Sequence, residues 1–167
     1  DGLDAVLGGA GGRVRVVALS WVRAESGWRA DLAATAEVAH AHGALLCVDA
    51  IQGLGARRCI VDGWGVDVLA SGAQKWTLGP QGIGVLALSP TALDLVAPIA
   101  GGQGVVTTVA PTTESAPAPT ARRHEGGGSS PVLVAGWRAS LGVLLGAGVE
   151  AVARWTDHLT DRLCTGA

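Results

Sequence analysis

The 167-residue sequence contains no Met, Phe, Tyr or Asn, and it has a single Lys. The missing types are largely those with A/T-rich codons, so we hypothesise a GC-rich gene; a coding sequence of ordinary base composition would contradict this. The absence of Met also predicts that position 1 is not a natural start and that the sequence is part of a longer chain. The six Trp are scattered along the sequence, which is typical of core packing rather than of base stacking.

An excess of charge of either sign is also absent, because 12 Lys+Arg stand against 14 Asp+Glu and the formal net charge is −2. This balance is neither basic enough for a nucleic-acid footprint nor acidic enough for a solvating tail. The length suits one domain, and 49% hydrophobic residues are ample for a packed core. We therefore expect a folded domain with no nucleic-acid partner.

The cysteines are few and widely spaced: Cys47, Cys59 and Cys164 form no Cys-x-x-Cys pair. An odd, scattered set argues against a disulfide framework or a zinc site and fits a reducing compartment. No charged-then-apolar signal segment opens the sequence. The most apolar long stretch, 132–149, carries Arg138 and several glycines, so it predicts a buried core helix rather than a membrane span. We expect a cytoplasmic protein without a membrane partner.

Short apolar runs bounded by turn residues predict strands, and a longer segment with helical spacing predicts a helix after the first of them. The strands are expected at 14–20, 44–48, 66–70 and 84–88, and the helix at 30–42. Strands that alternate with a helix favour parallel pairing through right-handed crossovers. The predicted fold is α/β, with a mostly parallel sheet flanked by helices.

Three regions follow from the change in composition along the chain. Residues 1–104 are expected to form the βα core, and 105–130 a Pro/Thr/Gly-rich loop that is extended rather than packed. Residues 131–167 are expected to form two helices, at 131–145 and 149–163.

Two charged residues follow predicted strands. Asp49 closes one apolar run, and Lys75 lies five residues beyond the strand at 66–70. In open parallel sheets ligands bind outside the carboxyl ends of the strands, so both residues are expected at that edge. The ordinary alternatives are an Asp that caps a turn and a Lys that is a solvated surface charge; for Asp49 alone the turn is favoured.

Lys75 is harder to explain as a surface charge, because the other eleven cationic residues are all Arg. Unlike Arg, a Lys can lose its proton and form a Schiff base when it is desolvated. The glycine-rich turn around it also contains Ser71 and Gln74, which can donate hydrogen bonds to phosphate oxygens. This combination indicates a cofactor that carries both a carbonyl group and a phosphate.

Four short motifs occur in order around these residues, at 48–53, 65–70, 71–76 and 79–84. Their spelling and separation resemble the class V aminotransferase and cysteine desulfurase family of pyridoxal-phosphate enzymes, which have fold type I. Downstream, the segment 123–127 looks like the family's Arg-Phe-Glu-x-Gly motif. The resemblance covers most of the chain and implies part of the cofactor-binding large domain, with N-terminal and small-domain portions missing.

The resemblance implies a role for each matching residue. Lys75 would form the Schiff base with pyridoxal phosphate and later move the substrate's α-proton. Asp49 would pair with the pyridine nitrogen, and Gln52 would hydrogen-bond the side of the ring that carries the phenolic oxygen. Ser71 would bind the phosphate, and Gln74 takes the place where many relatives have a phosphate-contacting His. An amino-acid substrate and a homodimer are implied as well.

Two departures from the family pattern bear on the reaction. A Thr that reaches the neighbouring subunit's phosphate in relatives is replaced by a stretch in which Ser129 or Ser130 could substitute. Many desulfurases have His-Val-Ser-Asn where this sequence has residues 21–24, Trp-Val-Arg-Ala, which weakens a desulfurase assignment. Transamination, elimination at a C–S bond, epimerisation and sulfur transfer all stay open. Cys164 is not assigned as a nucleophile.

Two alternatives belong to other classes. The chain could be a catalytically degenerate α/β scaffold or interaction domain, which need not bind a cofactor. It could also be a Schiff-base lysine enzyme without pyridoxal phosphate, such as an aldolase, although the pairing of Asp49 with Gln52 makes this less attractive. His40 and His42 face different ways on a predicted helix and His124 is expected to be a loop contact, so no metal site is predicted.

Overall fold

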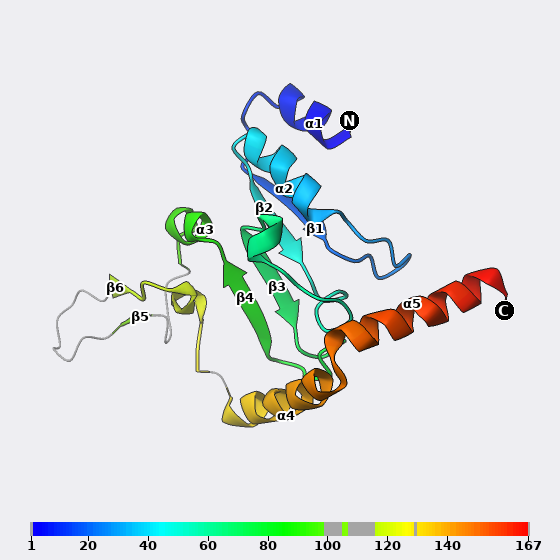
Figure 1. The fold of residues 1–167 in the computed structure, drawn as a ribbon. Helices are drawn as coiled ribbons and strands as arrows, with labels where there is room; N and C mark the ends of the chain where they lie inside the picture. Colours follow the sequence, from blue (N-terminus) through cyan, green and yellow to red (C-terminus); the bar gives the residue numbers. More distant parts are fainter. Residues whose placement is uncertain (1, 99–104, 107–115, 129, 167) are drawn as a thin grey trace.

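The computed structural model describes residues 2–98, 105–106, 116–128 and 130–166, and Figure 1 shows their arrangement. Its centre is a four-stranded sheet in the order β1-β2-β3-β4. The strands are β1 (Val16–Ser20), β2 (Leu45–Asp49), β3 (Val68–Gly72) and β4 (Gly84–Leu88). All four predicted strands are present, each within two residues of its expected limits.

The pairing of the strands is mixed rather than wholly parallel. β1 pairs with β2 and β2 with β3 in parallel, whereas β3 and β4 are antiparallel. Parallel pairing fails at β4 because the connection 73–83 contains no helix, and a chain that returns through a short loop meets the preceding strand antiparallel. The predicted α/β class with a mostly parallel sheet is confirmed.

Of the five α-helices in the described ranges, three correspond to the predicted ones: α2 (Leu32–Ala41), α4 (Pro131–Ala147) and α5 (Val149–Thr165). Asp31 caps α2 by accepting a hydrogen bond from the Ala34 N–H at 3.1 Å. The sequence patterns missed α1 (Gly2–Gly9) and α3 (Pro90–Leu95), which are too short to show a helical period. Ser89 was nevertheless a start signal for α3, since Ser is a preferred residue before the first helical turn. In the structure its side chain accepts a hydrogen bond from the Ala92 N–H at 3.1 Å.

The predicted extended loop is only partly described. β5 (Val105–Val106) and β6 (Ala116–Pro117) pair as a short antiparallel ribbon, and a 3₁₀ turn, η3 (Ala121–His124), follows. Within this loop, residues 107–115 and Ser129 lie outside the described residues.

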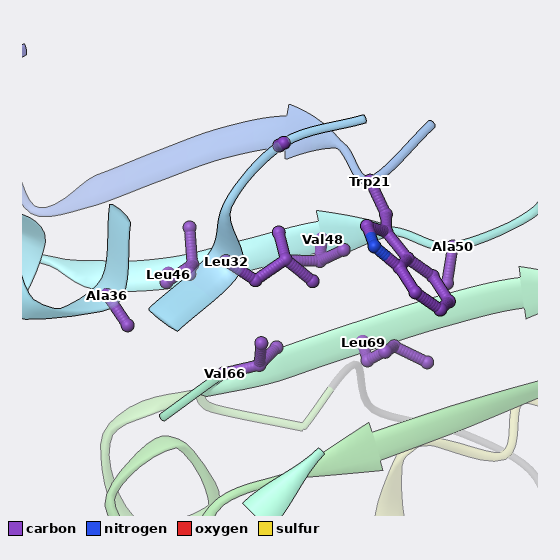
Figure 2. Close-up of a cluster of buried hydrophobic side chains, with 9 residues drawn as sticks. Trp21, Leu32, Ala36, Leu46, Val48, Ala50, Val66 and Leu69 are labelled. Atoms are coloured by element: carbon purple, nitrogen blue, oxygen red, sulfur yellow. The ribbon is translucent and has the colours of Figure 1, made fainter. Parts of the chain in front are cut away.

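The main core fills the space between the sheet and α2, and Figure 2 shows its side chains. Because Phe, Tyr and Met are absent, aliphatic residues and one indole fill it. The residues are Trp21, Ala30, Leu32, Ala36, Leu46, Val48, Ala50, Val66 and Leu69. Trp21 also packs on Trp64, of the 3₁₀ turn η1 (Asp62–Trp64), with ring centroids 4.9 Å apart.

A buried carboxylate joins this core to the neighbouring elements. Asp67, only 5% exposed, lies just before β3 and accepts hydrogen bonds from the Leu46 N–H (2.8 Å) and the Ser89 hydroxyl (2.9 Å). Nε2 of His40, on α2, lies 2.7 Å from the same carboxylate. Burial by itself raises the pKa of Asp67, but these hydrogen bonds outweigh it and the pKa is lowered.

The helix predicted at 131–145 is not the buried core helix that its composition indicated. Only Leu144 is buried in α4, since a single face of the helix packs against the rest of the chain. Within the described part, no single helix is long and apolar enough to cross a membrane. α4 and α5 reach that length and composition only as a pair, which is bent by 72°.

Candidate active site

The carboxyl ends of the three parallel strands meet at one edge of the sheet. Ser20 pairs in register with Asp49, and Asp49 pairs with Ala70. The Trp21 N–H donates to the carbonyl of Asp49 at 2.9 Å, and the Ala50 N–H donates to that of Ala70 at 2.8 Å. The loops after β1, β2 and β3 therefore begin side by side, which is the arrangement expected for a binding site in an open parallel sheet.

Asp49 is exposed at this edge and lines a pocket of about 550 Å³ together with Ser71. Its Oδ1 accepts from the Ile51 N–H at 2.9 Å, so it does stabilise the turn that follows β2. The opposite wall of the pocket comes from η3 and the residue after it and includes Arg122 and Glu125. Asp49 and Ser71 are thus two predicted site residues that share one pocket.

Gln52 belongs to a compact turn after β2, here called the Gln52 turn (residues 50–57). Two glycines let this turn approach its neighbours closely. A Cβ on Gly53 would lie 2.1 Å from the ring of Trp21, and one on Gly55 would lie 2.7 Å from the Trp76 carbonyl oxygen. Gly55 also has φ +95°, which side chains rarely adopt. The Gln52 turn is therefore wedged between the loop after β1 and the segment that carries Lys75.

Lys75 lies in the connection between β3 and β4, here called the Lys75 loop (residues 73–83). The Ala73 carbonyl accepts from the Thr77 hydroxyl and from the Gly79 N–H, both at 2.8 Å. The indole Nε1 of Trp137, on α4, donates to Thr77 Oγ1 at 3.0 Å. The backbone on either side of Lys75 is therefore anchored from the strand and from the helix.

The Lys75 side chain is exposed, and within the described residues no hydrogen bond or ion pair engages its amine. Gln74 is exposed too, but its side chain folds back over β3, since a Cβ on Gly72 would lie 2.3 Å from Gln74 Oε1. The Ser71 hydroxyl is buried and donates to the Gly72 carbonyl at 3.2 Å.

The structure thus brings all five predicted site residues to one edge of the sheet without placing them in a single pocket. Gln52 lines a second hollow, of about 440 Å³, and shares it with Trp76. Lys75 and Gln74 line neither this hollow nor the pocket of Asp49 and Ser71.

The chain is similar in sequence to proteins of one known family. The family model described as aminotransferase class-V matches residues 3–166. The chain belongs to this family. It is 31% identical over 157 residues to a cysteine desulfurase of Klebsiella pneumoniae, an alignment that covers 94% of this chain and 38% of the relative. It is 34% identical over 88 residues to L-aspartate–glyoxylate aminotransferase of Paracoccus denitrificans, covering 52% and 22% respectively.

Solved structures agree with this class V assignment. The apo cysteine desulfurase of Thermococcus onnurineus NA1 has a TM-score of 0.82 and 25% identity, with 98% of this chain and 40% of that chain covered. The chain therefore spans about a fifth to two fifths of the relatives' lengths. Class V aminotransferases and cysteine desulfurases use pyridoxal phosphate. The family resemblance seen in the sequence is confirmed.

The residues of this class V chain fit the cofactor in chemical type. Lys75 offers an amine that no described residue engages, and Asp49 offers a carboxylate with Oδ1 committed to a backbone N–H. Gly72 leaves room for the folded-back amide of Gln74, a space that a side chain on Gly72 would fill. Amine, carboxylate and amide are the groups that an aldehyde, a pyridine nitrogen and a phosphate respectively require.

Some residues of the site were missed from the sequence. Thr77 and Trp137 hold the Lys75 loop although they are 60 residues apart. His124, expected to be a loop contact, lines the pocket with Asp49, and its Nε2 is buried without a hydrogen-bond partner among the described residues. Of these residues, only Thr77 had a signal in the sequence, because it lies two positions after Lys75.

Proposed function

We propose that this chain is part of a pyridoxal-phosphate-dependent enzyme that acts on an amino acid, with Lys75 as the residue that attaches the cofactor. The observation that carries the proposal is the Lys75 loop. Its backbone is fixed at Ala73 by two hydrogen bonds of 2.8 Å, while the amine that it presents is free of partners among the described residues. A desolvated amine is expected from the sequence, whereas Lys75 is exposed in the described chain; the support for attachment is therefore the fixed backbone at the carboxyl edge of the sheet and not burial of the amine.

Each neighbouring residue would contribute one interaction. Asp49 would hold a proton on the ring nitrogen, and Gln52 would donate to the phenolic oxygen. Gln74 would donate to the phosphate, as would Ser71 once its hydroxyl turns from the Gly72 carbonyl. When bound, the cofactor supplies an electron sink for negative charge that develops at the substrate's Cα. Lys75 Nζ would then accept and return the proton at that carbon.

We extend the proposal to a homodimer in the cytoplasm. Family resemblance supports the dimer. Three free cysteines, Cys47, Cys59 and Cys164, support a reducing compartment, since the described residues hold no disulfide. The reaction itself stays open between amino-group transfer, C–S bond cleavage, epimerisation and sulfur transfer, because aminotransferases and cysteine desulfurases both match.

The test is the absorbance spectrum of the full-length protein with added pyridoxal phosphate. After unbound cofactor is removed, the wild type should retain a visible band, and borohydride reduction should leave the cofactor on the peptide that contains Lys75. Lys75→Ala and Lys75→Arg should both lack the band, since Arg keeps the charge but cannot attach the cofactor. A folded wild-type protein without the band would instead favour the non-catalytic scaffold.

A further inference from the structure

The Gln52 turn is a rigid unit that links the cofactor edge to a distant helix. Within it, the Gly53 N–H donates to the Ala50 carbonyl and the Arg57 N–H donates to the Gly53 carbonyl, both at 2.9 Å. Gln52 and Arg57 therefore lie in one hydrogen-bonded turn. Because only five positions separate them, a displacement of the Arg57 backbone would also displace the backbone of Gln52.

Arg57 binds α5 at three points. Its Nη1 donates to Asp157 Oδ2 at 2.6 Å and to the Ala153 carbonyl at 3.2 Å, and its Nη2 donates to Asp157 Oδ1. A two-pronged guanidinium–carboxylate contact fixes orientation as well as distance, unlike a single surface ion pair. The hydrogen bond from Arg57 lowers the pKa of Asp157.

α5 packs only shallowly on the rest of the described structure. None of its residues is buried, and in Figure 1 it extends away from the sheet. A neighbouring pair, Arg58 with Glu150, is 3.9 Å apart, and its side chains are 70% and 59% exposed. In the pair of Arg57 with Asp157 the carboxylate is exposed to a similar extent, 58%, but the side chain of Arg57 is only 23% exposed.

α5 also forms a wall of the hollow that Gln52 lines. Thr156, Asp157 and Thr160 of α5 face Gln52 and Trp76 across this space of about 440 Å³. A change in the tilt of α5 would therefore alter both the surroundings of Gln52 and, through Arg57, the position of its backbone.

We propose that Arg57 is a positioning residue: by clamping the Gln52 turn to Asp157 of α5, it sets where Gln52 meets the ring of the cofactor. This inference rests on the proposed function, since it assumes that the ring lies at the carboxyl edge of the sheet. It assigns to α5 a role in the site that acts through Arg57 and the Gln52 turn.

The experiment uses the full-length protein with pyridoxal phosphate as the probe. Arg57→Gln and Asp157→Asn each remove the two-pronged ionic contact between Arg57 and Asp157. Arg57→Lys keeps the charge without the planar guanidinium, and Arg58→Gln is the matched control. Two quantities are measured: the cofactor's dissociation constant with its visible absorbance maximum, and amide hydrogen exchange of the Gln52 turn without cofactor.

We expect Arg57→Gln and Asp157→Asn each to weaken cofactor binding about tenfold, equivalent to about 1.4 kcal/mol. Both should shift the absorbance maximum in the same direction as Gln52→Ala, a reference variant measured alongside them, and mere destabilisation would not cause such a shift. The double variant should be no worse than Arg57→Gln alone, because that substitution already removes the contact with Asp157. Arg57→Lys should recover part of the affinity, and Arg58→Gln should match the wild type.

An unchanged spectrum and affinity in both Arg57→Gln and Asp157→Asn would overturn the proposal. If Arg57→Gln fails to fold, Asp157→Asn decides alone, since it leaves Arg57 in place. Should the wild type bind no cofactor, the proposed function fails. Hydrogen exchange then tests separately whether Arg57 holds the Gln52 turn. Faster exchange of this turn in Arg57→Gln than in Arg58→Gln supports that role, and equal exchange in the two variants refutes it.

Discussion

The hydrogen bonds of Thr77 provide the sharpest test of how the Lys75 loop is held. Thr77 is 3% exposed, and its hydroxyl donates to the Ala73 carbonyl while accepting from Trp137 Nε1. Thr77→Val keeps the shape of the side chain but removes both interactions. At about 1 kcal/mol for each hydrogen bond, the substitution should lower the free energy of unfolding by about 2 kcal/mol.

Urea titration of the full-length protein, followed by tryptophan fluorescence, measures this change. Thr77→Ser is the control, because it keeps the hydroxyl and loses one methyl group, at a cost of about 0.8 kcal/mol. Combining Thr77→Val with Trp137→Phe removes the indole N–H that would otherwise lack its partner. The double variant should therefore be less destabilised than the sum of the two single variants.

The reasoning is refuted if Thr77→Val is as stable as the wild type while Thr77→Ser is less stable. The methyl group, which lies near Gly55, would then hold the loop instead of the hydroxyl. Strictly additive effects of the changes at Thr77 and Trp137 would contradict their direct hydrogen bond.

Two further predictions concern backbone space and pH. Gly55→Ala should lower the free energy of unfolding by about 1–3 kcal/mol and weaken cofactor binding, because its Cβ would meet the Trp76 carbonyl. Gly142 lies in the interior of α4 with open space around it, so Gly142→Ala should raise the free energy of unfolding by about 0.5–1 kcal/mol in the same urea titration. The pKa of Asp67 is lower in the folded state, so its stabilising contribution is complete above the unfolded pKa of about 3.9 and is lost as pH falls through the folded value. The stability difference between the wild type and Asp67→Asn should thus be large at pH 7 and shrink below pH of about 4, and a pH-independent difference would contradict it.

Local sequence patterns predicted much of the architecture because they report local physics. The alternation of apolar runs and turn residues located all four strands of the main sheet, and helical spacing located α2, α4 and α5. The position of Asp49 and Lys75 after strands predicted their shared edge, since parallel strands end together. The short helices α1 and α3 escaped because fewer than nine residues do not display a 3.6-residue period.

The sequence by itself determined the residue types of the site and the edge of the sheet at which they lie. Only the tertiary structure decided that β4 runs antiparallel, that α4 is mostly exposed, and that Gln52 and Asp49 line different hollows. It also decided which distant partners hold the two site turns: Trp137 lies 60 residues from Thr77, and Asp157 lies 100 residues from Arg57. A periodic pattern reports the burial of a side chain within its own element, whereas pairs so far apart in sequence meet only after the sheet has brought their elements together.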